Sequence, residues 1–124
     1  MTSKIDCSKV IVKNAYGKGD GAYANCDIKK DDIVEYGIVR VIDIVGHKCP
    51  YVFTWSEDKT KWALGSGCST FYNTDNNPNT KFIRYFDENR FEIIAVRNIS
   101  KGEELTHKYK SIQWRECFQN IQSS

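Results

Sequence analysis

GEELTHKY, at residues 102–109, is followed five residues later by Trp114. The stretch indicates a turn followed by a short strand that ends in Tyr109. A buried phenol can hold a charged or partly charged group, and an indole can stack on a purine or on a cation. Both aromatic rings could equally pack in a hydrophobic core, so the stretch is informative only in combination with others.

An earlier polar stretch, NTDNNPN at residues 73–79, is rich in asparagine. Asparagine side chains both donate and accept hydrogen bonds, so they can hold an amine and a carboxylate or tie remote backbone segments together. Pro78 restricts the local path of the chain. A polar connecting loop over residues 70–80 without any ligand is the simpler alternative.

A glycine-rich stretch, GKGDGAYA at residues 17–24, follows a β-type run. Alternate glycines let the backbone approach a ligand closely and present amide groups to it. The G-x-G-x-x-G pattern of dinucleotide-binding folds normally opens a long helix, and no helical pattern follows here. Taken alone, the stretch predicts a glycine-rich turn without a ligand.

Short β-type runs dominate the chain, and we predict a mainly β protein built of several small sheets with little helix. We expect two strands broken near Gly37, a hairpin closed by residues 87–89, and a single helix over Ser111–Gln122. The predicted strand regions are Lys9–Lys13, Ile33–Val45, Tyr51–Trp55, Lys81–Phe86 and Phe91–Val96.

Length and composition narrow the classes of function. A chain of 124 residues predicts one domain, residues 1–124, and 40% apolar residues suffice for a core. The formal net charge of +2 does not favour direct nucleic-acid binding. No run approaches the ~20 apolar residues that cross a bilayer, and no signal-peptide pattern opens the sequence, so we expect no membrane contact.

Cysteine usage points to a reducing compartment. The five cysteines are widely separated and odd in number, and no pair has C-x-x-C spacing: Cys7, Cys26, Cys49, Cys68 and Cys117. We therefore expect reduced thiols, an intracellular protein and no metal site.

In combination and in this order, the stretches resemble the SET domain family. The motifs of that family read roughly G-x-G-[VLA]-[FY]-A, N-H-x-x-x-P-N and G-E-E-[LI]-T-x-x-Y, which match residues 19–24, 73–79 and 102–109. A strand that ends in E-Y matches residues 33–36. The resemblance runs from about Val10 to Trp114, and the compact form is similar to small viral and bacterial SET proteins.

The resemblance implies a SET fold with a knot-like C-terminal segment, a core over about residues 10–114, and residues 110–124 covering the cofactor. It implies a protein-lysine N-methyltransferase that transfers a methyl group from S-adenosylmethionine to a lysine side chain. The implied partner is a protein with an exposed lysine, for which a histone tail is one candidate, and a histone substrate would place the protein in the nucleus. The resemblance also allows a homodimer.

The same resemblance assigns site residues. Tyr109 would be catalytic, and Tyr36 and His107 would line the channel for the substrate lysine. Asn73 would hold the amino group of the cofactor, and Trp114 would cover its adenine. The full set of expected cofactor residues is Lys18, Gly19, Asp20, Gly21, Ala22, Tyr23, Asn73, Thr74 and Trp114.

One position departs from the family pattern, because Thr74 stands where the second motif has histidine. This departure motivates an alternative, a SET-fold module that binds a protein or peptide with weak or no catalysis. A small β protein that binds a nucleotide through residues 17–21 is a further alternative.

Overall fold

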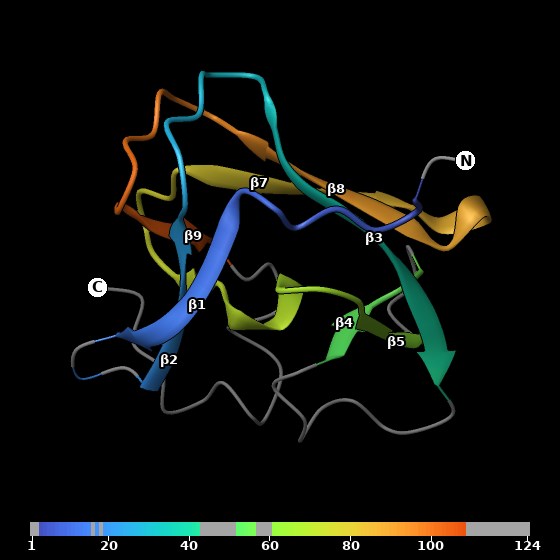
Figure 1. Ribbon diagram of the computed structural model, residues 1–124. Helices are drawn as coiled ribbons and strands as arrows, with labels where there is room; N and C mark the ends of the chain where they lie inside the picture. Colours follow the sequence, from blue (N-terminus) through green and yellow to red (C-terminus); the bar gives the residue numbers. More distant parts are fainter. Residues whose placement is uncertain (1–2, 16, 18, 43–51, 57–60, 109–124) are drawn as a thin grey trace.

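The computed structural model describes residues 3–15, 17, 19–42, 52–56 and 61–108, and all structural statements below concern these residues. This part of the chain is mainly β, as predicted. Its strands form a four-stranded sheet of order β1-β2-β9-β6 and a five-stranded sheet of order β4-β5-β3-β8-β7. In Figure 1, β7 and β8 extend across the upper part of the molecule, β3 descends from there toward the lower right, and β1, β2 and β9 lie at the left.

The smaller sheet is assembled from the two ends of the described chain and its middle. Its strands are β1 (Val10–Ala15), β2 (Gly19–Ala24), β6 (Asn73–Thr74) and β9 (Glu104–His107). Strand β2 pairs antiparallel with both β1 and β9, whereas β6 pairs parallel with β9. The sheet therefore joins segments that lie far apart in the sequence.

The prediction of a glycine-rich turn over residues 17–24 was wrong for most of its length, because residues 19–24 form strand β2. Glycine weakens a strand, which explains the prediction. Here the ladder with β1 and the burial of Ala22 and Ala24, which are 0% and 2% exposed, outweigh that effect.

The larger sheet consists of β3 (Ile33–Ile42), β4 (Val52–Thr54), β5 (Trp62–Gly65), β7 (Thr80–Tyr85) and β8 (Arg90–Ala95). The predicted hairpin is confirmed as β7 and β8, which are joined by a 3-10 turn, η3 (Phe86–Glu88), and by Asn89. Asn89 has φ 49°, a left-handed conformation that asparagine tolerates better than most residues. Strand β5 was not predicted, because its sequence WALG does not alternate.

Gly37 does not break the strand that contains it, contrary to the prediction of two strands over residues 33–45. Strand β3 runs through Gly37 because the missing side chain makes room for neighbours. A Cβ there would clash with Ser66 Oγ and lie 2.7 Å from Phe91 Cζ. Ser66 Oγ also accepts a hydrogen bond from the Ile38 amide at 3.0 Å. Glycine is required at this position because Ser66 and Phe91 pack closely against it. The sequence alone does not reveal these contacts.

Both sheets contribute to one hydrophobic core. Its buried members include Val10, Ala22, Ala24, Ile28, Val34, Val39, Tyr72, Phe91, Ile93, Ala95, Ile99 and Leu105. A short 3-10 turn, η2 (Ser69–Phe71), and β6 occupy part of the region predicted as loop. The predicted helix over residues 111–122 lies outside the described residues. No helix in the described part of the chain has the length and apolar composition that crossing a bilayer requires.

Candidate cofactor and substrate site

Strand β9 brings the three sequence motifs together. Ala22 of the glycine stretch pairs with Leu105 on one side of β9, and Asn73 pairs with Thr106 on the other. Residues 19–24, 104–107 and 73–74 of these stretches thus lie side by side in one sheet, of which Figure 1 labels β2 and β9. The fold therefore brings together three stretches that are distant in the sequence.

Asn73 is held against β9 by its side chain as well as its backbone. Its Nδ2 donates a hydrogen bond to Glu104 Oε2 at 2.9 Å. The next part of the loop is fixed by the Asp75 amide, which donates to the His107 carbonyl at 3.0 Å. The half-buried amide of Asn73 is therefore placed at the junction of β6 and β9.

Asn79, the last residue of the asparagine stretch, ties the loop to the backbone of β9. Its side chain is 2% exposed. Nδ2 donates to the Glu104 carbonyl at 2.8 Å, and Oδ1 accepts from the Thr106 amide at 2.9 Å. Thr80 Oγ1 adds a bond to the Thr106 carbonyl at 2.7 Å. The prediction that asparagines could tie remote backbone segments together is confirmed at Asn79, although this residue was not named as a site residue.

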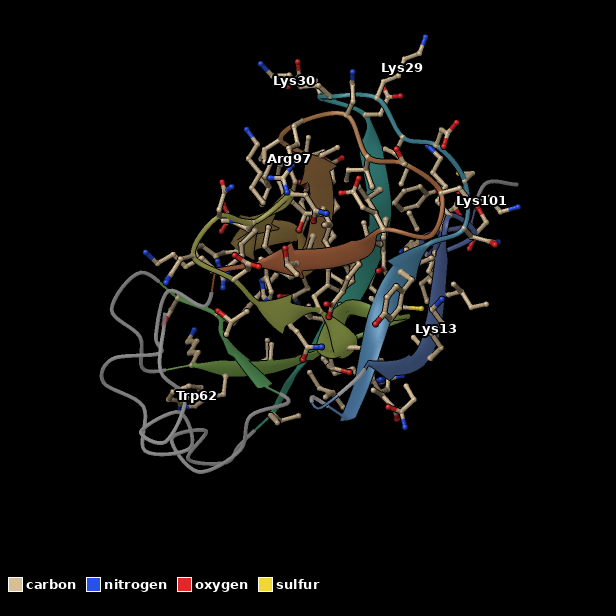
Figure 2. All side chains as sticks on the ribbon, turned by 90° about the vertical axis from the view of Figure 1, so that its left-hand side faces the viewer. Lys13, Lys29, Lys30, Trp62, Arg97 and Lys101 are labelled. Carbon is tan, nitrogen blue, oxygen red and sulfur yellow. The ribbon has the colours of Figure 1, made fainter. Side chains whose placement is uncertain are left out.

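The glycine strand has an open end and a packed end. Gly19 and Asp20 are exposed, and Gly19 has φ +77° with no atom within 4 Å of where a Cβ would lie. Gly21 and Ala22 are buried in the sheet. Tyr23 is half-buried, and Lys13 Nζ lies 4.4 Å from its ring centroid. Figure 2 labels Lys13, which lies on β1. The open end is where a ligand could approach the backbone.

Three of the expected site residues, Lys18, Tyr109 and Trp114, lie outside the described residues. Their roles stay predictions. The described chain ends with Lys108, one residue after β9, so Tyr109 follows directly in sequence from the strand that joins the motifs.

His107, expected in the lysine channel, is buried at the end of β9. Its ring packs edge-on against Tyr72, with centroids 6.1 Å apart, and tilted against Phe82 at 6.5 Å. Burial and the nearby charge of Arg84 lower the pKa of His107 to about 4, against the opposing effect of a backbone hydrogen bond at Tyr72. The imidazole is therefore neutral at physiological pH.

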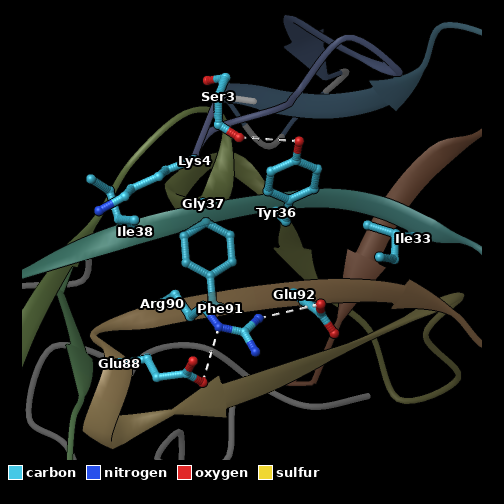
Figure 3. Close-up of a pocket in the computed structure, with 10 residues that line it drawn as sticks. All are labelled: Ser3, Lys4, Ile33, Tyr36, Gly37, Ile38, Glu88, Arg90, Phe91 and Glu92. Atoms are coloured by element: carbon cyan, nitrogen blue, oxygen red, sulfur yellow. Dashed lines mark hydrogen bonds and ion pairs between the residues drawn. The ribbon is translucent and has the colours of Figure 1, made fainter. Parts of the chain in front are cut away.

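Tyr36, the other expected channel residue, lines a cavity of about 470 Å³ beside β3 and β8. Its hydroxyl donates to the Ser3 carbonyl at 3.3 Å, and Arg90 is held between Glu88 and Glu92 at 3.1 and 3.3 Å (Figure 3). The lining residues are Ser3, Lys4, Ile33, Tyr36, Gly37, Ile38, Glu88, Arg90, Phe91 and Glu92. His107 is not among them, so this cavity does not bring the two expected channel residues together.

Comparison with known families decides the assignment. The family model described as "SET domain" matches residues 19–110, which is most of the chain. The chain belongs to the SET domain family.

Solved structures share the fold of this chain. A Plasmodium falciparum protein named as a candidate histone methyltransferase is 24% identical, with a TM-score of 0.66. ctPRC2 of Chaetomium thermophilum, in an autoinhibited conformation bound to S-adenosylmethionine, is 23% identical with a TM-score of 0.67. ATXR5 in complex with histone H3.1 mono-methylated on R26 is 24% identical with a TM-score of 0.64.

The overlap with these structures differs greatly in extent. The aligned parts cover 82%, 86% and 84% of this SET domain. They cover 92% of the Plasmodium chain, but only 16% of the ctPRC2 chain and 58% of the ATXR5 chain. No curated protein matches the sequence.

The SET domain also contains a buried carboxyl group that the sequence analysis did not single out. Glu35 on β3 is 1% exposed. Its Oε1 accepts a hydrogen bond from the Tyr72 hydroxyl at 2.8 Å, and its Oε2 accepts one from the Cys68 amide at 2.8 Å. Burial raises the pKa of Glu35 to about 7. Strict alternation along β3 would not bury Val34 and Glu35 together; a register irregularity between Ile33 and Glu35 allows it.

Proposed function

We propose that this SET domain is a protein-lysine N-methyltransferase that uses S-adenosylmethionine. The observation that supports it most is the meeting of the three motifs in one sheet, with β9 between β2 and β6. The sheet carries an open glycine backbone on β2 and, between β6 and β9, an asparagine amide bonded to a carboxylate. These groups suit a ligand that carries both an ammonium and a carboxylate group.

The described residues fit the methionine part of such a cofactor. Asn73 uses its Nδ2 to bond Glu104, and no donor from the described residues bonds to its Oδ1. That oxygen is available to accept from an ammonium group. The backbone at Gly19 is open, and a carboxylate group could bind to amides presented there. S-adenosylmethionine, when bound, supplies an electrophilic methyl group on a sulfonium.

The surroundings of His107 suit a lysine substrate. Methyl transfer needs a neutral amine, whereas a lysine in water titrates near ~10.4. The buried neutral imidazole of His107, packed by Tyr72 and Phe82, adds no charge to that part of the protein. An apolar aromatic environment disfavours the ammonium form, so the amine loses its proton more easily. Tyr109 would orient the amine and the methyl group and stabilise charge, rather than act as a strong base.

The proposed substrate is a lysine on a histone. A structural neighbour is named as a candidate histone methyltransferase, and another is bound to histone H3.1. A histone substrate would place the protein in the nucleus. The alternative is a SET-fold binding module without catalysis. It is motivated by Thr74, which replaces the histidine of the second family motif and pairs with His107 of β9.

Two measurements on the full chain separate these functions. Calorimetry measures binding of S-adenosylmethionine, and incorporation of a labelled methyl group is then measured on a panel of histones and lysine peptides. Binding together with incorporation supports the methyltransferase. Binding without incorporation on any lysine substrate supports the module, and no binding contradicts both the proposed cofactor and the proposed activity.

A further inference from the structure

Three side chains that can ligate a metal ion meet beside strand β3. They are Cys7 in the N-terminal segment, Glu35 on β3 and Cys68 just before η2. One ligand atom from each lies within 4.8 Å of the other two. Tetrahedral zinc with Zn–S of ~2.3 Å and Zn–O of ~2.1 Å places its ligand atoms roughly 3.5–3.8 Å apart. The cluster therefore needs only small side-chain adjustments to reach that geometry.

The backbone around the cluster is firmly held. Asp6 exchanges two backbone hydrogen bonds with Tyr36, at 2.9 and 3.1 Å, which fixes the residue before Cys7 beside β3. The Cys68 amide donates to Glu35 Oε2, and the Tyr72 hydroxyl orients the other carboxylate oxygen. Such partners commonly orient the ligands of metal sites.

Gly67 keeps the space between these side chains open. It has φ +64°, and a Cβ there would lie 2.5 Å from Glu35 Oε2 and 3.6 Å from Cys7 Sγ. Any other residue at this position would fill the region between carboxylate and thiol. Glycine is thus needed for two reasons, its backbone conformation and the approach of the ligands.

The ligating groups of the cluster disfavour one another's ionised forms. Burial, together with the neighbouring Glu35 and Cys7, raises the pKa of Cys68 to about 12. The pKa of Glu35 is raised by burial and, to a smaller extent, by Asp6. No lysine or arginine within the described ranges donates a hydrogen bond to any of the three ligands. A divalent ion would relieve the repulsion among their ionised forms.

We propose that Cys7, Glu35 and Cys68 bind a zinc ion, with water completing the coordination. Two thiolates and one carboxylate select zinc over magnesium or calcium, which prefer oxygen ligands. On binding, the thiol protons and any proton on Glu35 pass to solvent. The ion would link the N-terminal segment to β3 and to the turn that leads into Asn73. The zinc ion takes no part in the proposed methyl-transfer step. The site goes against the expectation of no metal, which rested on cysteine spacing along the sequence alone.

Cobalt(II) is the probe that tests this site, because cobalt thiolates have a charge-transfer absorption band that zinc abolishes on displacement. The reduced, chelator-stripped full chain should bind one equivalent of cobalt with this band. The band should be lost in C7S and in C68S, and kept in C26S and in the double variant C49S/C117S. Absence of the band in the wild type, its persistence in C7S, or its loss in C49S/C117S would overturn the proposal.

Thermal unfolding provides a second measurement that does not depend on spectroscopy. Cys7 is only half-buried, so C7S should fold. Zinc should raise the Tm of the wild type and of C26S and leave the Tm of C7S unchanged. Because thiol protons are displaced, the apparent zinc affinity should also fall at least about tenfold per pH unit of acidification. Equal stabilisation of the wild type and C7S would contradict the site.

Discussion

The Asn73 side-chain amide donates a hydrogen bond to the Glu104 carboxylate at 2.9 Å, and so joins β6 to β9 through side chains as well as backbone. The two residues lie 31 positions apart. The side-chain oxygen of Asn73, Oδ1, accepts no hydrogen bond from the described part of the chain. The proposed cofactor would use that oxygen.

Asn73→Ala should weaken binding of S-adenosylmethionine by roughly tenfold to a hundredfold, because a hydrogen bond to a charged group contributes ~1.5–3 kcal/mol. Calorimetry measures the change. Asn76→Ala is the matched control, because Asn76 is an exposed residue of the same loop. Equal affinities for N73A and N76A would remove Asn73 from the cofactor site.

Asn79→Ala should lower the free energy of unfolding by about 2–4 kcal/mol, because it leaves the Glu104 carbonyl and the Thr106 amide without their buried partner. Urea denaturation measures the loss. Asn77→Ala serves as the control, since Asn77 is exposed and its side chain should contribute less than about 0.5 kcal/mol. A similar small change in both variants would contradict the role given to Asn79.

The buried carboxyl of Glu35 should make stability depend on pH. Its pKa is raised from 4.5 to about 7 in the folded protein, so between these values the folded state binds a proton that the unfolded state does not. The free energy of unfolding should therefore fall as pH rises from about 4.5 to about 7, by up to about 3 kcal/mol. Urea denaturation across this range, in the presence of a chelator, measures the effect.

Glu35→Gln should remove this component, so the difference between wild type and variant should itself change with pH. Glu88→Gln, at an exposed carboxylate, should keep the wild-type dependence. A constant difference between wild type and E35Q would show that Glu35 does not titrate in this range.

Gly37→Ala should destabilise the fold by about 1–3 kcal/mol, because a Cβ at this position would collide with Ser66 Oγ and the Phe91 ring. Thermal unfolding measures the shift. Val41→Ala, an exposed change on the same strand, should cost less than about 0.5 kcal/mol. Should G37A prove as stable as V41A, the close packing against Phe91 would be refuted.

The sequence predicted those features that depend on neighbouring residues or on a recognisable motif. The hairpin of β7 and β8 follows from two alternating runs around a short turn. The convergence of the asparagine stretch and GEELTHKY could be expected only from the order of the motifs, because the pairing of Asn73 with Thr106 is between distant segments.

The features that were missed depend on contacts between remote residues. Gly37 looks like a strand breaker until the Phe91 ring is placed against it. Glu35 looks like an ordinary charged strand residue until the irregularity in β3 turns it inward toward Tyr72. Cys7 and Cys68 are far apart in the sequence, so no spacing rule relates them, yet the fold brings them together with Glu35.

The most direct test of the central claim compares the wild type with Tyr109→Phe. Labelled methyl incorporation into a histone panel and calorimetric binding of S-adenosylmethionine are measured on both proteins. We predict that the wild type methylates a lysine, and that Y109F binds the cofactor with similar affinity while losing roughly a hundredfold or more of the incorporation. Undiminished incorporation by Y109F, or a wild type that binds the cofactor and methylates no lysine, would contradict the account.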